Sequence, residues 1–405
     1  MKKQLCMVLA TTVITTMSLP AVAFADTTAS TTNINTSTSA ITTTAPAIIV
    51  KDMTFTTPVV KLSLNDTYKK LETSTTMDFI KLQKKMDEAT AQGYVEKYYD
   101  MKKGNDRSSE AFWSYDSSNT NMTRAMKVFA QSMIEPNNTA RINKLHRDIF
   151  EQYYTLKNME TQVSIAKDNL TITEKLLSNA QLKFKLGTVS KMDVLTAEMN
   201  VKKVKDTYKA AQDGLNALKM NFNTSMSYDL MQGVALTDTI NEVAVPTTSL
   251  ESAIKSAFAN RVELKESAYN VQMAQLAFDK VHAYPPYSAA YISAQANLLN
   301  AQKNNDVTPD KIEMEIRSKY MDMMTAYQKV QSGKQNVSNA LESARLTQLQ
   351  YDSGMTTITT VQQANVDSYN AQLDQAKALL EYNLAIEDFK LAQGVGTKSA
   401  TIMSE

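Results

Sequence analysis

Two short turns, each flanked by long segments with a heptad pattern, constrain the fold of this 405-residue chain more than any other feature. Gly187 and Gly354 lie 167 positions apart, and at this offset six residues around one turn match six around the other in identity or type. The first set is Gln181, Leu182, Phe184, Gly187, Val194 and Ala197, and the second is Gln348, Leu349, Tyr351, Gly354, Val361 and Ala364. The chain is therefore an internal duplication.

Apolar residues recur alternately every four and three positions on both sides of the turns, which is typical of a coiled-coil seam. The seam that enters the first turn runs from Leu145 to Phe184, and the seam that leaves it runs from Val194 to Phe222. Adding 167 carries the entering seam onto residues 312–351 without insertion or deletion. We predict an all-α fold of two tandem, antiparallel coiled-coil hairpins, with helices of about 40 residues, on the order of 60 Å long.

Each turn contains residues that favour a helix end followed by a helix start. Glycine adopts positive φ at low steric cost, which suits the end of the entering helix at Gly187 and Gly354. Ser190 lies three residues before Asp193, the spacing of an N-cap with an acidic residue in the first helical turn. From spacing alone, Asp193 is either a functional residue of the turn or simply a helix-start residue.

The first 47 residues differ in composition from the rest of the chain. Residues 1–25 combine Lys2 and Lys3, an apolar stretch and an Ala23-Phe24-Ala25 cleavage pattern, which predicts a secretory signal peptide. The only cysteine, Cys6, lies inside this segment, so we expect no disulfide in the exported chain. Residues 26–47 are rich in Thr and Ser and are expected to be a disordered spacer. We assign residues 48–235 to the first repeat and 236–398 to the second.

Breaks in the helical pattern are predicted within the first repeat. Ser63 and Asp66 form a capping pattern before a helix that we expect to reach about Lys103. Turn-forming residues at 104–106 and 114–121 interrupt the pattern, which becomes helical again from Met122. Glu135-Pro136-Asn137-Asn138 is then expected to end that helix before the first hairpin.

The second repeat is expected to begin after a linking region at residues 223–245, which has room for a small side structure. The repeat restarts at residues 248–254, and another helix is predicted to follow through residues 261–264 to His282, where Pro285 and Pro286 stop or kink it. Asn304-Asn305-Asp306 with Pro309 is predicted to start the long helix of the second hairpin.

The turns and their surroundings resemble the TolC-like family of bacterial outer-membrane efflux proteins. In that family each repeat carries an aromatic-x-x-Gly phrase followed by Asp-Val-Leu-x-Ala. The first turn matches this phrase fully, through Phe184, Gly187, Asp193, Val194, Leu195 and Ala197. The second turn matches it in part, through Tyr351, Gly354, Val361 and Ala364. A second family phrase is similar to Ser249-Leu250 with Ala253 and Ala257, followed by Asn260-Arg261-Val262-Glu263-Leu264. The resemblance spans about residues 60–395.

The resemblance implies an exported efflux or secretion channel in which three copies of the chain contribute hairpins to one helical tunnel. The turns would dock a periplasmic-adaptor-like protein, which works with an inner-membrane pump or exporter, and would open the tunnel. The candidate docking and gating residues are Gly187, Thr188, Val189, Ser190, Asp193, Gly354, Met355, Thr356, Thr360 and Gln363. The expected location is the cell envelope: the outer membrane if the host has one, otherwise secreted or wall-associated.

The sequence departs from the family in two places. Thr360 and Gln363 stand where other members carry aspartates, so a ring of carboxylates is not predicted from this repeat. The family inserts membrane strands before each entering helix, but residues 104–138 and 284–309 show weak or no strand alternation. An alternative therefore stays open: a soluble or wall-associated coiled-coil binding or structural protein without a channel.

Enzymatic chemistry has little support in the sequence. His146 and His282 lie on predicted helices without neighbouring metal-ligating residues, so a structural role is expected for both. We find no phosphate-binding loop or nucleophile elbow, and we predict no catalytic, metal or cofactor site. The formal net charge of +1 gives no support for nucleic-acid binding.

Overall fold

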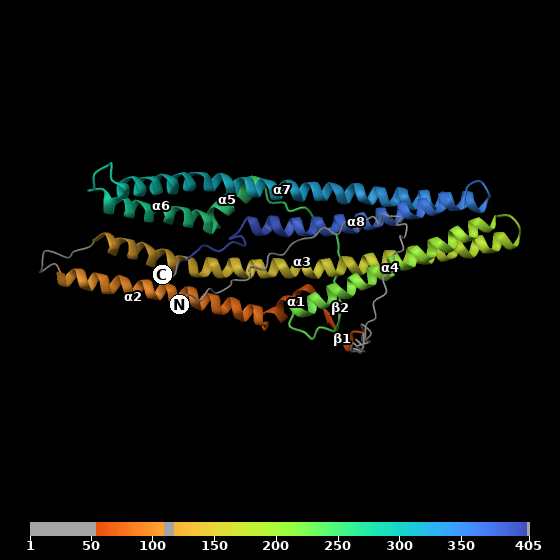
Figure 1. Ribbon diagram of the computed structural model, residues 1–405, viewed down its shortest axis with the longest axis horizontal. Helices are drawn as coiled ribbons and strands as arrows, with labels where there is room; N and C mark the ends of the chain where they lie inside the picture. Colours follow the sequence, from red (N-terminus) through yellow and green to blue (C-terminus); the bar gives the residue numbers. More distant parts are fainter. Residues whose placement is uncertain (1–53, 109–116, 403–405) are drawn as a thin grey trace, which may run out of the picture. The chain divides into compact units, whose positions relative to one another are not determined.

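A computed structural model describes residues 54–108 and 117–402, and there the chain is predominantly helical (Figure 1). The predicted signal peptide and spacer lie outside the described residues. The elements are β1 (Thr56–Leu62), α1 (Leu64–Leu71), α2 (Thr75–Ser108), α3 (Ser117–Lys185), α4 (Lys191–Ser225), β2 (Gln232–Leu236), α5 (Leu250–Asn260), α6 (Val262–Val281), α7 (Ala289–Asp352) and α8 (Ile358–Ala392). The predicted fold class is confirmed.

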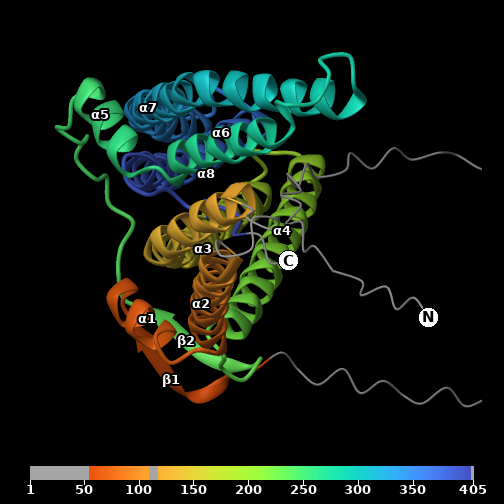
Figure 2. The ribbon, with the colours of Figure 1, turned by 90° about the vertical axis from the view of Figure 1, so that its left-hand side faces the viewer.

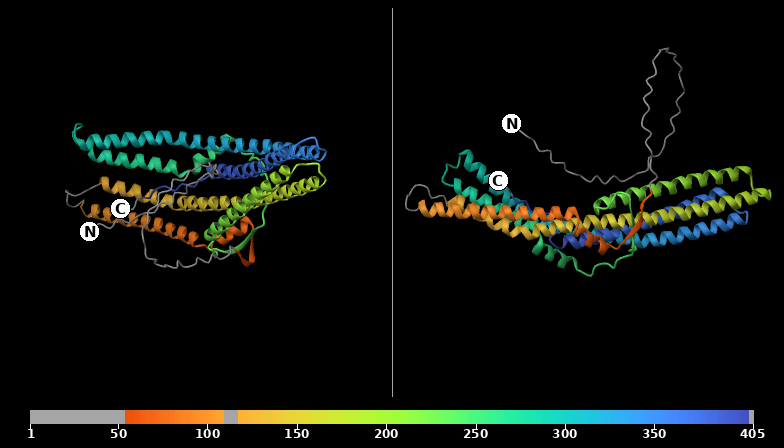
Figure 3. Two further views of the ribbon diagram at one scale, coloured as in Figure 1. Left: turned by 45° about the vertical axis from the view of Figure 1, so that its right-hand side comes forward. Right: turned by 90° about the horizontal axis from the view of Figure 1, so that it is seen from below.

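The two hairpins, α3 with α4 and α7 with α8, repeat with the spacing that the sequence predicts. Helices α3 and α7 end at residues that lie 167 positions apart. Helices α4 and α8 begin at residues with the same separation, and they also end with it. Both turns lie at the same end of the hairpins in three views (Figures 1 and 3). The duplication therefore includes the helix boundaries as well as the seams.

The heptad seams are buried inside each hairpin at equivalent positions. Ile149, Leu156 and Phe222 of the first hairpin are at most 2% exposed, and their equivalents Ile316, Met323 and Phe389 are fully buried. Burying each such side chain contributes about 1.5–3 kcal/mol relative to leaving it exposed. The same seam positions therefore stabilise both hairpins.

The predicted helix boundaries next to Pro136 and Pro309 are wrong. Pro136 lies inside α3, which has 69 residues, and Pro309 lies inside α7, which has 64. A proline removes one backbone hydrogen bond and costs about 3 kcal/mol in a helix interior. Tertiary packing outweighs this cost here, since Asn137, the residue after Pro136, is fully buried.

Two further boundaries differ from the prediction. Helix α2 continues through Gly104 to Ser108, and α3 already begins at Ser117 rather than Met122. The two segments compared with the family's membrane strands, residues 104–138 and 284–309, contain helix wherever they are described, apart from the short connection before α7. None of the described helices combines the length and the apolar character needed to cross a membrane.

A two-stranded parallel sheet supplies the side structure expected in the linking region. Strand β1 pairs with β2, and Leu62 lies opposite Leu236. Both leucines are buried, and the Tyr153 hydroxyl donates to the Leu62 carbonyl oxygen at 3.1 Å. The sheet thus packs against α3 of the first hairpin, at a place where the sequence predicted no strand before Leu62.

Shorter helices pack beside the hairpins in each repeat. Helix α2 packs on α3, and α6 packs on α7 and α3 (Figure 2). Helix α5 is separated from α6 at Arg261, which has extended backbone and whose side chain is 3% exposed. That guanidinium bonds Glu263 and Glu315, both through its Nη2 atom at 2.7 Å. The Asn-Arg-x-Glu-Leu phrase therefore positions a buried arginine between two partly exposed glutamates.

Candidate functional site: the paired hairpin turns

The turn between α3 and α4 (the first turn) and the turn between α7 and α8 (the second turn) share one backbone geometry. Gly187 and Gly354 have φ of +72° and +77°, in the left-handed region that favours glycine. The Thr188 amide donates to the Lys183 carbonyl at 2.9 Å, and the Met355 amide donates to the Gln350 carbonyl at 2.8 Å. These are equivalent helix-ending bonds of the Schellman type.

The helix starts after the turns differ in their caps. Ser190 and Asp193 form a reciprocal capping box, in which the Asp193 amide donates to Ser190 Oγ at 3.2 Å and the Ser190 amide donates to the Asp193 carboxylate at 2.9 Å. At the second turn Thr357 caps α8, accepting from the Thr360 amide at 3.4 Å. The acidic residue at the first helix start is therefore explained structurally, whether or not Asp193 has a further role.

One lysine joins the two turns. Lys183 Nζ donates to the Tyr351 carbonyl oxygen at 2.6 Å and lies 3.9 Å from the Asp352 carboxylate. The same ammonium group is 3.9 Å from the centroid of the Tyr351 ring, a cation–π contact. Lys183 therefore connects the end of the first hairpin to the end of the second.

A small apolar cluster lies beneath this lysine contact. It consists of Leu176, Ala180 and Ala197 from the first hairpin with Tyr351, Ile358 and Val361 from the second. Burial, followed by the charges of Asp193 and Asp352, raises the pKa of Tyr351. The Tyr351 hydroxyl is buried and has no hydrogen-bond partner within the described residues. The cluster thus packs the two hairpin ends together at the cost of one unsatisfied hydroxyl.

The duplicated aromatic residues of the two turns have opposite environments. Tyr351 is 4% exposed because the first hairpin covers it, whereas its equivalent Phe184 is 44% exposed. Near Phe184 the first hairpin end also exposes Leu182, Leu186, Met192, Leu195 and Met199. Leu182 and Leu186 are four residues apart, and Met192, Leu195 and Met199 follow at spacings of three and four, so each of these two groups lies on one side of its helix, whereas Phe184 points to another side of α3. We call these six residues the first-turn apolar face.

The two hairpin ends also differ in charge. Residues 180–205 contain six lysines and two acidic residues, whereas the equivalent residues 347–372 contain two aspartates and no lysine or arginine. The first end therefore combines basic charge with exposed apolar side chains, and the second end is mildly acidic. Such a mixed apolar and charged surface is typical of protein interaction sites.

The candidate residues gather at these two turns. Thr188, Ser190, Met355, Thr360 and Gln363 are exposed, and Val189, Asp193 and Thr356 are half-buried. Thr188 Oγ1 donates to the Lys183 carbonyl at 2.9 Å, and Gln363 Nε2 donates to Asp367 at 2.8 Å. The structure places the candidate residues of both turns at one end of the hairpins, and their docking and gating roles stay predictions.

Both histidines make aromatic contacts, and the structural role expected for them stays a prediction. The His146 ring centroid is 4.6 Å from that of Tyr68, and burial lowers the pKa of His146. His282 lies 5.8 Å from Phe278 and 6.5 Å from Tyr291, measured between ring centroids. Within the described residues no group of three or more histidine, cysteine or acidic side chains gathers into a metal-binding arrangement.

A polar junction between the repeats was not expected from the sequence. Arg147 of α3 donates to Asp388 of α8 at 2.8 Å, and Lys319 of α7 donates to the same carboxylate at 3.0 Å. Burial opposes ionisation of Asp388, but the hydrogen bonds and charges of Arg147 and then Lys319 outweigh it and hold the pKa below its usual range. Arg147 and Asp388 are 241 positions apart, so no local sequence signal announces their contact.

Comparison by sequence gives no assignment, because no family profile and no curated protein matches the chain. Comparison by structure gives clear likenesses. The outer membrane protein VceC from Vibrio cholerae superposes with a TM-score of 0.59 and 16% identity, covering 83% of this chain and 97% of VceC. CusC, a transmembrane channel, gives a TM-score of 0.62 at 10% identity, covering 85% of this chain and 94% of CusC.

A third solved structure extends the pattern. The open state of the MtrE outer membrane channel from Neisseria gonorrhoeae gives a TM-score of 0.54 at 13% identity, covering 83% of this chain and 89% of MtrE. Identities this low establish the fold alone. The chain therefore has the fold of the helical outer membrane channels that the turn phrases resemble.

Proposed function

We propose that this protein is the channel component of an envelope export system, with the paired turns as its docking and opening end. The observation that carries the proposal is the fold likeness to VceC, CusC and MtrE, which covers more than four fifths of the chain. The proposed assembly is a homotrimer, working with a periplasmic-adaptor-like protein and an inner-membrane pump or exporter. Its proposed location is the cell envelope, in the outer membrane if the host has one.

The surface at the turns supports docking of a protein partner. The first-turn apolar face presents six large apolar side chains beside a net basic charge. Unpartnered apolar side chains at this density favour burial against another protein, and the lysines favour a partner with acidic side chains at the rim. The proposed role for Lys183 is to hold the two turns together until a partner displaces it.

The test is an export assay in the host with a fluorescent cation such as ethidium. Deleting the gene is expected to raise ethidium retention, and the natural chain is expected to restore export. Leu186→Asp and Met192→Asp place charges on the first-turn apolar face, which is exposed, so folding is expected to survive while export falls.

A matched control uses the same substitution elsewhere. Leu299 in α7 is 59% exposed and lies far along the chain from either turn, so Leu299→Asp is expected to leave export unchanged. Equal loss in the turn variants and the control would contradict docking at the turns. Unchanged retention in the deletion strain, across several substrates, would favour the alternative of a coiled-coil binding or structural protein.

A further inference from the structure

The residues after α8 cross back over both repeats. We call Gln393–Ile402 the strap. It turns at Gly396, where φ is +80° and a Cβ atom would lie 3.0 Å from Nη1 of the buried Arg261. Glycine is favoured here by the backbone conformation, and any larger residue would also crowd the guanidinium group.

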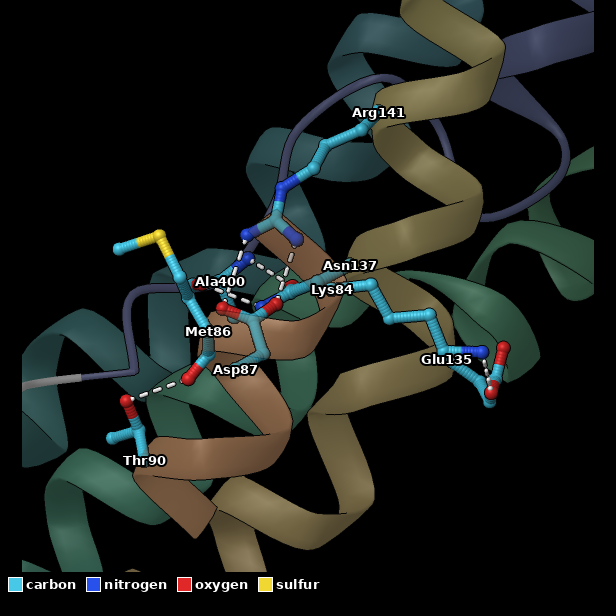
Figure 4. A network of polar contacts seen from close by, with 8 residues as sticks. All are labelled: Lys84, Met86, Asp87, Thr90, Glu135, Asn137, Arg141 and Ala400. Carbon is cyan, nitrogen blue, oxygen red and sulfur yellow. Dashed lines mark hydrogen bonds and ion pairs between the residues drawn. The ribbon is translucent and has the colours of Figure 1, made fainter. Parts of the chain in front are cut away.

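The strongest polar contact of the strap is a two-way bond with α3. Asn137 Nδ2 donates to the Ala400 carbonyl at 3.0 Å, and the Ala400 amide donates to Asn137 Oδ1 at 2.7 Å (Figure 4). Asn137 is fully buried and Ala400 is 5% exposed. Leaving a buried polar group of this kind unpaired costs about 1–3 kcal/mol, so the bond strongly favours a docked strap.

Other polar contacts connect the strap to both repeats. Asn143 of α3 donates to the Gly396 carbonyl at 3.0 Å, and the Thr401 amide donates to Glu266 of α6 at 3.2 Å. Lys398 lies 3.8 Å from Glu315 of α7. Because α3 belongs to the first repeat and α6 and α7 to the second, the strap bonds the two repeats to each other.

Apolar packing reinforces these bonds. Val395 and Ile402 pack against a cluster of Phe129, Met133, Val262 and Ala400, in which the Phe129 ring of α3 stacks on Tyr269 of α6 with centroids 3.9 Å apart. Ile402 also packs against Ala91, Tyr94 and Ala130 of α2 and α3. Close by, Arg141 of α3 bonds Asp87 of α2 at 2.7 Å and 3.3 Å (Figure 4). Removing the strap would expose the apolar surface that these clusters share.

The strap lies far from the turns. Asn137 and Gly187 are separated by 50 residues, which is about 75 Å of helix at 1.5 Å per residue. At the turn end, the polar link described between the repeats comes from Lys183, with a small apolar cluster beneath it. At the strap end, buried hydrogen bonds, an aromatic stack and two apolar clusters together hold the repeats. The repeats are therefore held much more strongly at the strap end than at the turns.

We propose that the strap is a clamp that fixes the two repeats to each other, so that the turns part by pivoting about it. The clamp is a property of the chain by itself. Its use in transport rests on the proposed opening at the turns.

The experiment measures distances at both ends of the purified full chain by paired spin labels. Cys6, the only cysteine, lies in the predicted signal peptide and is replaced by serine so that any chain that keeps this segment carries no third thiol. One label pair, Lys185→Cys with Thr359→Cys, reports on the turns, and the other, Gln131→Cys with Ala268→Cys, reports on the strap end. All four positions are exposed on helices.

Two perturbations separate the ends. Lys183→Ala is expected to give a longer and broader distance distribution for the turn pair and to leave the strap pair unchanged. Ala400→Pro removes the amide that donates to Asn137, so the strap pair is expected to lengthen and broaden. Ser399→Ala, at the exposed neighbouring position, serves as the matched control and is expected to change neither pair.

Two results would overturn the proposal. An unchanged strap pair in Ala400→Pro would show that the strap does not hold the repeats, and equal shifts of both pairs in Lys183→Ala would show that there is no pivot. If Ala400→Pro fails to fold, Ile402→Ala weakens the apolar anchor without altering any helix and takes its place. The export assay uses other variants, so failure of the transport proposal would leave these distance results valid.

Discussion

The first and second turns have the same backbone but different surfaces. Both end a helix at a left-handed glycine with equivalent hydrogen bonds, and both start the next helix with a hydroxyl cap. Yet the first end is basic and exposes Phe184, whereas the second is mildly acidic and buries Tyr351. Backbone geometry therefore persisted through the duplication while the side chains diverged according to their neighbours.

The cause of the difference is the position of each turn in the chain's own packing. The second hairpin lies against the first, so Tyr351, Ile358 and Val361 are covered by Leu176 and Ala180. Nothing described in the chain covers Phe184 to the same extent. The second turn thus buries its aromatic residue within the chain's own packing while Leu349 and Met355 stay exposed, and the first turn leaves its aromatic residue accessible to other molecules.

The largest expected effect separates the two aromatic residues. Tyr351→Ala removes a buried ring and is expected to lower the free energy of unfolding by about 3 kcal/mol. Phe184→Ala removes an exposed ring at the equivalent position and is expected to cost less than about 1 kcal/mol. Urea unfolding monitored by circular dichroism measures both variants. Equal losses would mean that Phe184 is covered in solution.

Substituting the turn glycines is expected to affect both turns alike. Gly187→Val and Gly354→Val force a side chain into positive φ, at a cost of about 1–2 kcal/mol each. Crowding at the added Cβ atom does not contribute, because a Cβ atom at either position meets no atom within 4 Å. Gly93→Ala, in the interior of α2 with similar open space, is the control and is expected to stabilise the chain by about 0.5–1 kcal/mol. Clearly unequal losses of unfolding free energy in the two valine variants would contradict the shared backbone geometry of the turns.

Exchanging the joining lysine tests the link between the turns. Lys183→Gln removes the cation over the Tyr351 ring and its charge-assisted bond, with an expected loss of about 1 kcal/mol in unfolding free energy. Gln350 occupies the equivalent position at the second turn, and Gln350→Ala is expected to cost only a few tenths of that amount. A double-mutant cycle of Lys183→Gln with Tyr351→Phe should show little coupling, because the lysine contacts the ring and carbonyl rather than the hydroxyl.

The smallest expected effect concerns pH and lies away from the turns. Burial lowers the pKa of His146 in the folded chain, so the unfolded chain binds more protons near its ordinary pKa of about 6.5. Stability should therefore fall as pH drops from 7 to 5. Asp388, whose pKa is also lowered, loses its contribution only below about pH 4, the ordinary range of an aspartate.

A histidine replacement isolates this contribution. His146→Phe keeps a ring against Tyr68 and should remove most of the decline between pH 7 and 5 in thermal unfolding. The turn variants should keep the parent's pH dependence. An undiminished decline in His146→Phe would assign the pH dependence to another group.

Local chemistry explains which parts of the fold could be predicted. Gly187, Gly354 and the Ser190–Asp193 cap act within a few residues, and the heptad seam repeats along each helix, so all were visible in the sequence. The helix boundaries predicted at Pro136 and Pro309 were wrong because the cost of a proline inside a helix was weighed without the tertiary packing that offsets it. Asn137, expected to help end a helix, instead continues it and bonds Ala400, 263 positions away.

Long-range contacts at the candidate site had no sequence signal. Lys183 looks like any solvated lysine of a helix face until the second turn is placed beside it, and Tyr351 differs little from Phe184 as a motif residue. The strand pair β1–β2 and the strap likewise join segments more than a hundred residues apart. The positions of the candidate residues were predictable, and their contacts across the repeats were not.

The uninterrupted length of α3 has a mechanical consequence. A helix held firmly near Asn137 acts as a lever arm of about 75 Å that ends at Gly187. A rotation of about 5° at the held end displaces the turn by about 6 Å, roughly one helical pitch. Side-chain rearrangements too small to disturb the buried clusters would therefore be amplified into a large displacement at the turns.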